Sequence, residues 1–158
     1  SYMKIKQTML SAALAAATMC AAGAAFAGPP VTVTFKNLST QEATYKVVTN
    51  NEVSTNTNAS PKPKTTVQPQ GADTYVVQNI ISPDANAATV RYTIGSKTCV
   101  FGTTFVNQIS GGALLPGGPT KIPKWNKTAT ASGGAVCTAT IKSQNLSNYS
   151  WTVEFTMK

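Results

Sequence analysis

The chain has 158 residues, with 13 lysine and arginine residues, five aspartate and glutamate residues and no histidine, which gives a net charge of +8. The absence of histidine excludes Ser-His-Asp and Cys-His hydrolases and most zinc hydrolases. The lysines are scattered and are not interleaved with aromatic residues, so the positive charge does not indicate nucleic-acid binding.

The first 27 residues have the pattern of a secretion signal. The basic residues Lys4 and Lys6 precede an apolar run over residues 9–22, and the small residues Ala25 and Ala27 follow it. The apolar run is too short and too rich in alanine for a membrane span, which needs about 20 strongly apolar residues. The pattern predicts cleavage after Ala27.

Cleavage at that bond leaves residues 28–158, which we expect to form a single domain in the periplasm or at the cell surface. Ser1 and Tyr2 precede the first methionine and are interpreted as a remnant appended to the natural chain. Residues 1–27 are therefore not expected to belong to the domain.

Removal of the signal also removes Cys20 and leaves two cysteines, Cys99 and Cys137. Each lies in a segment of alternating apolar residues. In an exported domain such a pair predicts one disulfide. With no histidine to join them, the two cysteines are not expected to form a zinc or haem site, and we expect no metal and no cofactor.

Period-two alternation of apolar and polar residues predicts seven or eight short strands. In chain order they cover residues 31–36, 43–49, 66–68, 73–81, 89–94, 98–105, 135–142 and 149–157. Their inward-facing positions are expected to form a core of Val33, Phe35, Val47, Val76, Val90, Tyr92, Phe101, Cys137, Ile141, Trp151, Val153 and Phe155.

No segment has apolar residues at helical spacing over three turns, so no helix beyond a turn or two is expected. Residues 50–64 are rich in asparagine and threonine and are expected to form a long exposed loop. The pattern as a whole predicts an all-β fold, an antiparallel two-sheet sandwich of immunoglobulin-like type with one disulfide. A closed barrel is the alternative.

Residues 106–125 interrupt the alternation with glycine pairs and prolines, which predicts a second long loop. Long loops in compact domains are often functional, and the stretch 108–127 combines apolar and basic side chains. It is the candidate binding loop, with Leu114, Leu115, Lys121, Lys124, Trp125 and Lys127 as its site residues. Such a loop could contact an anionic membrane or an acidic polysaccharide. Alternatively, Leu114, Leu115 and Trp125 fold back and cap one end of the sandwich.

The residues that could support catalysis are few. The five carboxylates are well separated in sequence, and glycosidase chemistry needs two carboxylates about 5 to 9 Å apart. They are Glu42, Glu52, Asp73, Asp84 and Glu154. The glycine pairs lack the Gly-Lys-Ser/Thr ending of a phosphate-binding loop. We predict no catalytic residues and no enzyme activity.

The signal, the single cysteine pair and the strand pattern of the mature chain resemble small secreted β-sandwich proteins of Gram-negative bacteria, some of which are surface antigens. The alternating segment 31–35 and the alternating C-terminal strand are also similar to chaperone-usher pilins. Pilins usually bridge cysteines in their first half and carry an aromatic residue near the C-terminus, where this chain has Met157 and Lys158. The size and basic character are similar to aegerolysins and actinoporins, but Trp125 alone does not make their aromatic membrane patch.

These observations favour an exported, non-catalytic surface or interaction protein, a possible host-contact antigen. We expect it to be a monomer that meets an unknown protein or glycan at the cell surface, with membrane contact as a further possibility and no nucleic-acid partner. One alternative is a chaperone-usher pilus subunit or fimbria-like adhesin. Another is a toxin-like module that binds membranes or glycans.

Overall fold

The computed structural model describes residues 26–111 and 116–158, which form ten strands and one helix. Sheet A has the order β3-β5-β1-β10-β9. Its strands are β1 (Val31–Asn37), β3 (Ala59–Ser60), β5 (Ala72–Val77), β9 (Cys137–Gln144) and β10 (Trp151–Met157). Sheet B has the order β4-β2-β6-β7-β8. Its strands are β2 (Ala43–Lys46), β4 (Thr66–Val67), β6 (Ala85–Ile94), β7 (Lys97–Ser110) and β8 (Thr120–Ser132).

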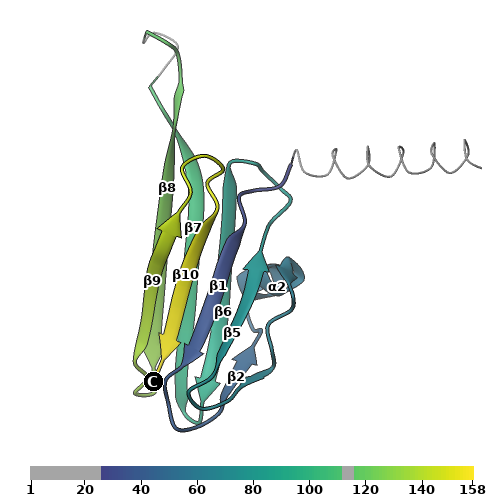
Figure 1. The fold of residues 1–158 in the computed structure, drawn as a ribbon, viewed down its shortest axis with the longest axis vertical. Helices are drawn as coiled ribbons and strands as arrows, with labels where there is room; N and C mark the ends of the chain where they lie inside the picture. Colours follow the sequence, from purple (N-terminus) through teal and green to yellow (C-terminus); the bar gives the residue numbers. More distant parts are fainter. Residues whose placement is uncertain (1–25, 112–115) are drawn as a thin grey trace, which may run out of the picture.

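The first strand lies in the interior of sheet A, parallel to β10 and antiparallel to β5. The apolar and polar residues of β1 alternate between the buried and the outer face of the sheet. Val31, Val33 and Phe35 are fully buried, while Thr32 and Thr34 lie on the outer face. The prediction of a half-buried strand beginning at Val31 is confirmed, and the first and last strands are neighbours in the sheet (Figure 1).

The two sheets face each other across a core rich in aromatic side chains. Phe35 of β1 stacks on Tyr92 of β6 with ring centroids 3.6 Å apart. Phe101 of β7 stacks on Phe155 of β10 at 4.8 Å. Because each pair joins one sheet to the other, burial of these rings holds the sheets together.

The predicted disulfide is confirmed. Cys99 of β7 and Cys137 of β9 are bonded, with their Cα atoms 5.7 Å apart and 38 positions apart in sequence. Since β7 belongs to sheet B and β9 to sheet A, the bond connects the two layers covalently. The all-β class with one disulfide is therefore confirmed, with ten strands in place of the seven or eight expected.

The prediction of a loop over residues 50–64 is wrong. Helix α2 (Asn50–Thr57) begins there, and β3 follows it. Thr49 and Glu52 form a capping box, in which each side chain bonds the backbone N–H of the other residue. Glu52 is fully buried and pairs with Arg91 of β6, its Oε1 lying 2.7 Å from the arginine Nε. This ion pair and cap stabilise a helix that has little apolar surface of its own.

The expectation that Val47 and Val76 belong to the core is wrong. Val47 follows the end of β2 and is 40% exposed. Val76 lies on the outer face of β5, because Tyr75 and Val77 are the buried positions of that strand. The rest of the expected core is buried or packs partly against it, as Ile141 does.

Candidate functional site

The segment predicted as a second long loop is mostly strand. Strands β7 and β8 pair from Thr98 opposite Ser132 to Ser110 opposite Thr120. Strand β6 accompanies β7 only as far as Val106, so residues 107–110 have β8 as their ladder partner. Figure 1 shows the result, a β7–β8 hairpin that extends beyond the ends of the other strands. The prediction of irregular structure over residues 106–125 is wrong at both of its ends.

Four of the six candidate loop residues, Lys121, Lys124, Trp125 and Lys127, lie on β8. Trp125 packs inward. Its ring centroid is 5.2 Å from that of Phe105 and 6.2 Å from that of Tyr149. Its indole Nε1 donates a hydrogen bond to the Tyr149 carbonyl oxygen at 3.2 Å. This is the folded-back arrangement that the capping alternative describes. Leu114 and Leu115 lie outside the described residues.

The three lysines of the candidate loop do not form one surface. Lys121 is paired with Asp84, with 2.9 Å from its Nζ to each carboxylate oxygen. Hydrogen bonds from Lys121 and Asn107 lower the pKa of Asp84 and attach the base of the hairpin to the loop before β6. Lys124 and Lys127 are exposed three residues apart on β8, hence on opposite faces of the strand.

Sequence reasoning missed a group of exposed apolar side chains at the end of the body from which the hairpin projects. We call this region the hairpin end and define it as Ile80, Ile81, Val106, Ile109 and Ile122. In the β7–β8 ladder, Val106 and Ile122 lie on one face of the hairpin and Ile109 lies on the other. Ile81 is 85% exposed and Ile109 is 72% exposed. Ile81 and Val106 also line an apolar hollow of about 280 Å³ beside β7. The pair Ile80-Ile81, set between polar residues and Ser82-Pro83, is the sequence signal that could have drawn attention to it.

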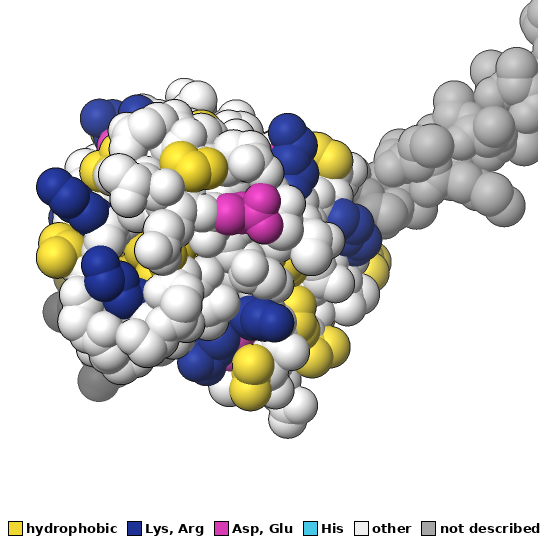
Figure 2. Space-filling model, turned by 90° about the horizontal axis from the view of Figure 1, so that it is seen from below, with side chains coloured by type: hydrophobic (Ala, Val, Ile, Leu, Met, Phe, Trp, Pro, Cys, Tyr) yellow, Lys and Arg dark blue, Asp and Glu magenta, His cyan; other side chains and the backbone are white. Residues whose placement is uncertain are grey.

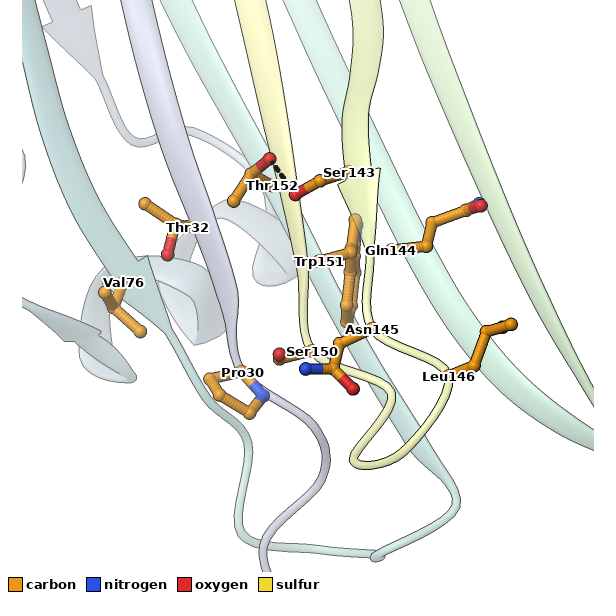
Figure 3. Close-up of a pocket in the computed structure, with 10 residues that line it drawn as sticks. All are labelled: Pro30, Thr32, Val76, Ser143, Gln144, Asn145, Leu146, Ser150, Trp151 and Thr152. Atoms are coloured by element: carbon orange, nitrogen blue, oxygen red, sulfur yellow. Dashed lines mark hydrogen bonds between the residues drawn. The ribbon is translucent and has the colours of Figure 1, made fainter.

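A second depression crosses the outer face of sheet A, near the turn between β9 and β10 (Figure 3). Its volume is about 730 Å³, and we call it the sheet A groove. Its lining is uncharged and consists of Pro30, Thr32, Val76, Ser143, Gln144, Asn145, Leu146, Ser150, Trp151 and Thr152. The hydroxyls of Ser143 and Thr152 bond each other at 2.7 Å on its floor.

The opposite end of the molecule has a mixed surface. Figure 2 views that end and shows lysine and arginine side chains singly or in small groups, with neutral and apolar surface between the groups. An acidic side chain lies near the middle of the same face. A continuous basic patch of the kind that binds a polyanion is not present on the face shown.

All five carboxylates are held by structural partners. Three form ion pairs, Glu52 with Arg91, Asp84 with Lys121 and Glu154 with Lys36. Asp73 accepts a hydrogen bond from the Lys64 backbone N–H at 2.7 Å, and Glu42 accepts one from the Gln68 amide at 2.7 Å.

Glu52 is the most perturbed of these carboxyls. Burial raises its pKa, but hydrogen bonds from Arg91 and Thr49 outweigh that effect and lower it to about 2. A general acid needs a pKa near the working pH, whereas the pKa of Glu52 is shifted down, away from neutral pH.

Over residues 26–111 and 116–158 the structure brings together no group of three or more metal-ligating side chains. The same part of the chain contains no helix of the length and hydrophobicity needed to cross a membrane. No protein-family model matches the chain, and no curated protein matches it significantly.

Proposed function

We propose that this protein is an exported, non-catalytic surface or interaction protein that meets a protein partner through the hairpin end. The observation that carries the proposal is the exposure of Ile81 and Val106 beside an apolar hollow, with exposed Ile122 on the same face of the hairpin as Val106. Monomeric proteins rarely expose large apolar patches without a binding role. An apolar surface of this kind fits the core of a protein–protein contact.

The location proposed is the periplasm or the cell surface. The signal pattern and the disulfide support it, since disulfides persist in oxidising compartments. Gly28 also marks where the packed body begins: its N–H bonds the Asn79 carbonyl at 2.9 Å, and a Cβ there would collide with the Ala85 carbonyl oxygen. We expect the mass of the exported protein to correspond to residues 28–158 with both cysteines oxidised. A mass that includes residues 1–27 would contradict export by this signal.

The fold type proposed is an immunoglobulin-like sandwich. Two facing sheets, a parallel pairing of the first and last strands and a disulfide between the layers support it. We also propose that the protein is not an enzyme. This is supported by the five carboxylates, each of which already forms an ion pair or accepts a hydrogen bond.

The two alternatives have less support. A chaperone-usher pilus subunit is expected to lack a strand until a neighbour donates one. Here β1 of the same chain lies between β5 and β10 and pairs with both. A toxin-like membrane module would be expected to expose aromatic residues, whereas Trp125 packs on Phe105 and Tyr149.

The test is binding to intact cells and to an array of cell-surface proteins, with the exported protein carrying a fluorescent label. The double variant Ile109→Ser/Ile122→Ser removes one exposed apolar side chain from each face of the hairpin. The control Val48→Ser/Val136→Ser removes two exposed apolar side chains elsewhere. We expect binding to fall about tenfold or more in the first and to be unchanged in the second. Equal binding by both variants would overturn the proposal.

A further inference from the structure

We propose that the sheet A groove is a binding site for a neutral saccharide. This site is separate from the hairpin end and does not depend on the function proposed for it. The groove's volume of about 730 Å³ lies within the range of small-molecule sites, roughly 300 to 1,000 Å³.

The charge of the groove favours a neutral ligand. The chain has 13 basic and five acidic residues, yet all ten residues that line the groove are uncharged. An ionic ligand would lose hydration in the groove without gaining an opposite charge. The lining therefore selects against anions and cations.

The groove contains a hydrogen-bond donor that is held in place. Asn145 uses its side-chain oxygen to accept bonds from the backbone N–H groups of Ser147 and Asn148, at 2.8 and 3.2 Å. These bonds fix the orientation of the amide. Its nitrogen then points toward Ser150 and Pro30, into the groove (Figure 3). Within the described part of the chain this nitrogen has no hydrogen-bond partner.

The groove combines hydroxyl groups with apolar surface. Ser143, Thr152 and Thr32 present hydroxyls, which both donate and accept hydrogen bonds, as sugar hydroxyls do. Pro30, Val76 and Leu146 supply apolar surface beside them. Sugar rings likewise combine hydroxyl edges with apolar C–H faces, so the groove matches them on both counts.

A peptide fits this place less well. The groove lies across strands β5, β1, β10 and β9, whose backbone groups are already paired with one another in sheet A. An extended peptide adds to an open sheet edge through backbone bonds, and such bonds are not offered here. Recognition has to use side chains, which suits a saccharide.

Affinity is expected to be in the millimolar range. Strong saccharide sites stack the sugar on an aromatic ring, and the one aromatic residue of the lining, Trp151, is turned away. Its indole is 2% exposed and donates its N–H to the Thr103 hydroxyl inside the core at 2.9 Å.

The test is an NMR titration of the ¹⁵N-labelled exported protein with maltose, cellobiose, lactose and N,N′-diacetylchitobiose. We expect saturable shifts with at least one of them, centred on Thr32, Ser143, Asn145 and Thr152. Asn145→Asp keeps the oxygen that holds the turn and replaces the donor, so it should weaken binding about tenfold. Asn126→Asp adds the same charge on the outer face of sheet B and should not change it.

Thr32→Val gives a second variant in case Asn145→Asp disturbs the turn. It removes an outward hydroxyl from β1, preserves the side-chain shape and should weaken binding by a few fold. The proposal would be overturned if none of the four sugars gave saturable shifts, or if the shifts were centred on the hairpin end. It would also be overturned if the wild type and both groove variants bound the sugar with equal affinity. Since Ile109→Ser/Ile122→Ser should leave saccharide binding intact, the two proposals fail independently.

Discussion

Removal of the disulfide should cost the protein a large part of its stability. In Cys99→Ala/Cys137→Ala the chain between the two positions, 38 residues in sequence separation, is no longer closed in the unfolded state. The chain-entropy model gives about 4 kcal/mol for a loop of this length. A single domain is usually stable by about 5 to 15 kcal/mol, so the loss is a substantial fraction of the total.

The position of the bond makes the expected loss larger. Cys99 is fully buried in the core, so alanine there also removes packed atoms. The bond ties β7 of sheet B to β9 of sheet A, and β9 is the last strand of its sheet on that side. Without it, β9 is held by its ladder to β10 and by side-chain packing.

The assay is urea unfolding followed by tryptophan fluorescence, with the oxidised wild type, the reduced wild type and the double variant compared at one temperature. We expect the free energy of unfolding to fall by about 4 kcal/mol on reduction, and by more in the variant, which also loses packed atoms at Cys99. A loss below about 1 kcal/mol would refute the reasoning, because it would mean that core packing alone fixes the two sheets.

Three further predictions concern stability. The pKa of Glu52 is lowered from its ordinary value of 4.5 to about 2, so its ion pair stabilises the fold fully above pH 4.5, and this stabilisation is lost as the pH falls toward 2. Glu52→Gln should therefore cost about 3 kcal/mol at neutral pH. In a plot of unfolding free energy against pH, it should also reduce the loss of stability in acid. Gly133→Ala should destabilise the protein by about 2 kcal/mol, because φ is positive there and the new Cβ would collide with the Ser96 carbonyl oxygen. Gly134 also has a positive φ but open space around it, so Gly134→Ala should cost about half as much. Urea unfolding measures both. Trp125→Ala should lower the melting temperature and cost about 2 kcal/mol in scanning calorimetry, since the indole packs on the end of the core; an unchanged melting temperature would contradict that role.

The elements predicted well from sequence are those whose own residues carry the information. The alternation in β1 and β10 follows from one face being buried, so Val33 and Phe155 could be placed in the core without a structure. The pairing of Cys99 with Cys137 could be predicted because, outside the proposed signal, the sequence contains only these two cysteines. Neither inference required knowledge of distant contacts.

The elements that were missed depend on contacts made elsewhere in the chain. Helix α2 has no apolar stripe and is fixed by Arg91, which lies 39 positions from Glu52. Only its capping box was visible in the sequence. Strand β8 is almost entirely exposed, so no alternation reveals it, and its ladder to β7 alone defines it.

The candidate site was only partly predictable for the same reason. Sequence reasoning placed the site in one contiguous segment, whereas the hairpin end draws on the loop before β6, on β7 and on β8. The lysines of the segment separate in space, and Lys121 is occupied by Asp84. The sheet A groove likewise combines residues of β1 and of the β9–β10 hairpin with Val76 of β5.

The central claim is that the hairpin end is the contact surface of an exported interaction protein. Hydrogen–deuterium exchange, measured on the exported protein with and without a partner recovered from the cell-surface array, tests it most directly. We predict that binding slows exchange in residues 79–82, 106–110 and 120–124 and leaves the opposite end, around Leu38 and Val136, unchanged. Slowed exchange at that opposite end, with none at the hairpin, would contradict the claim.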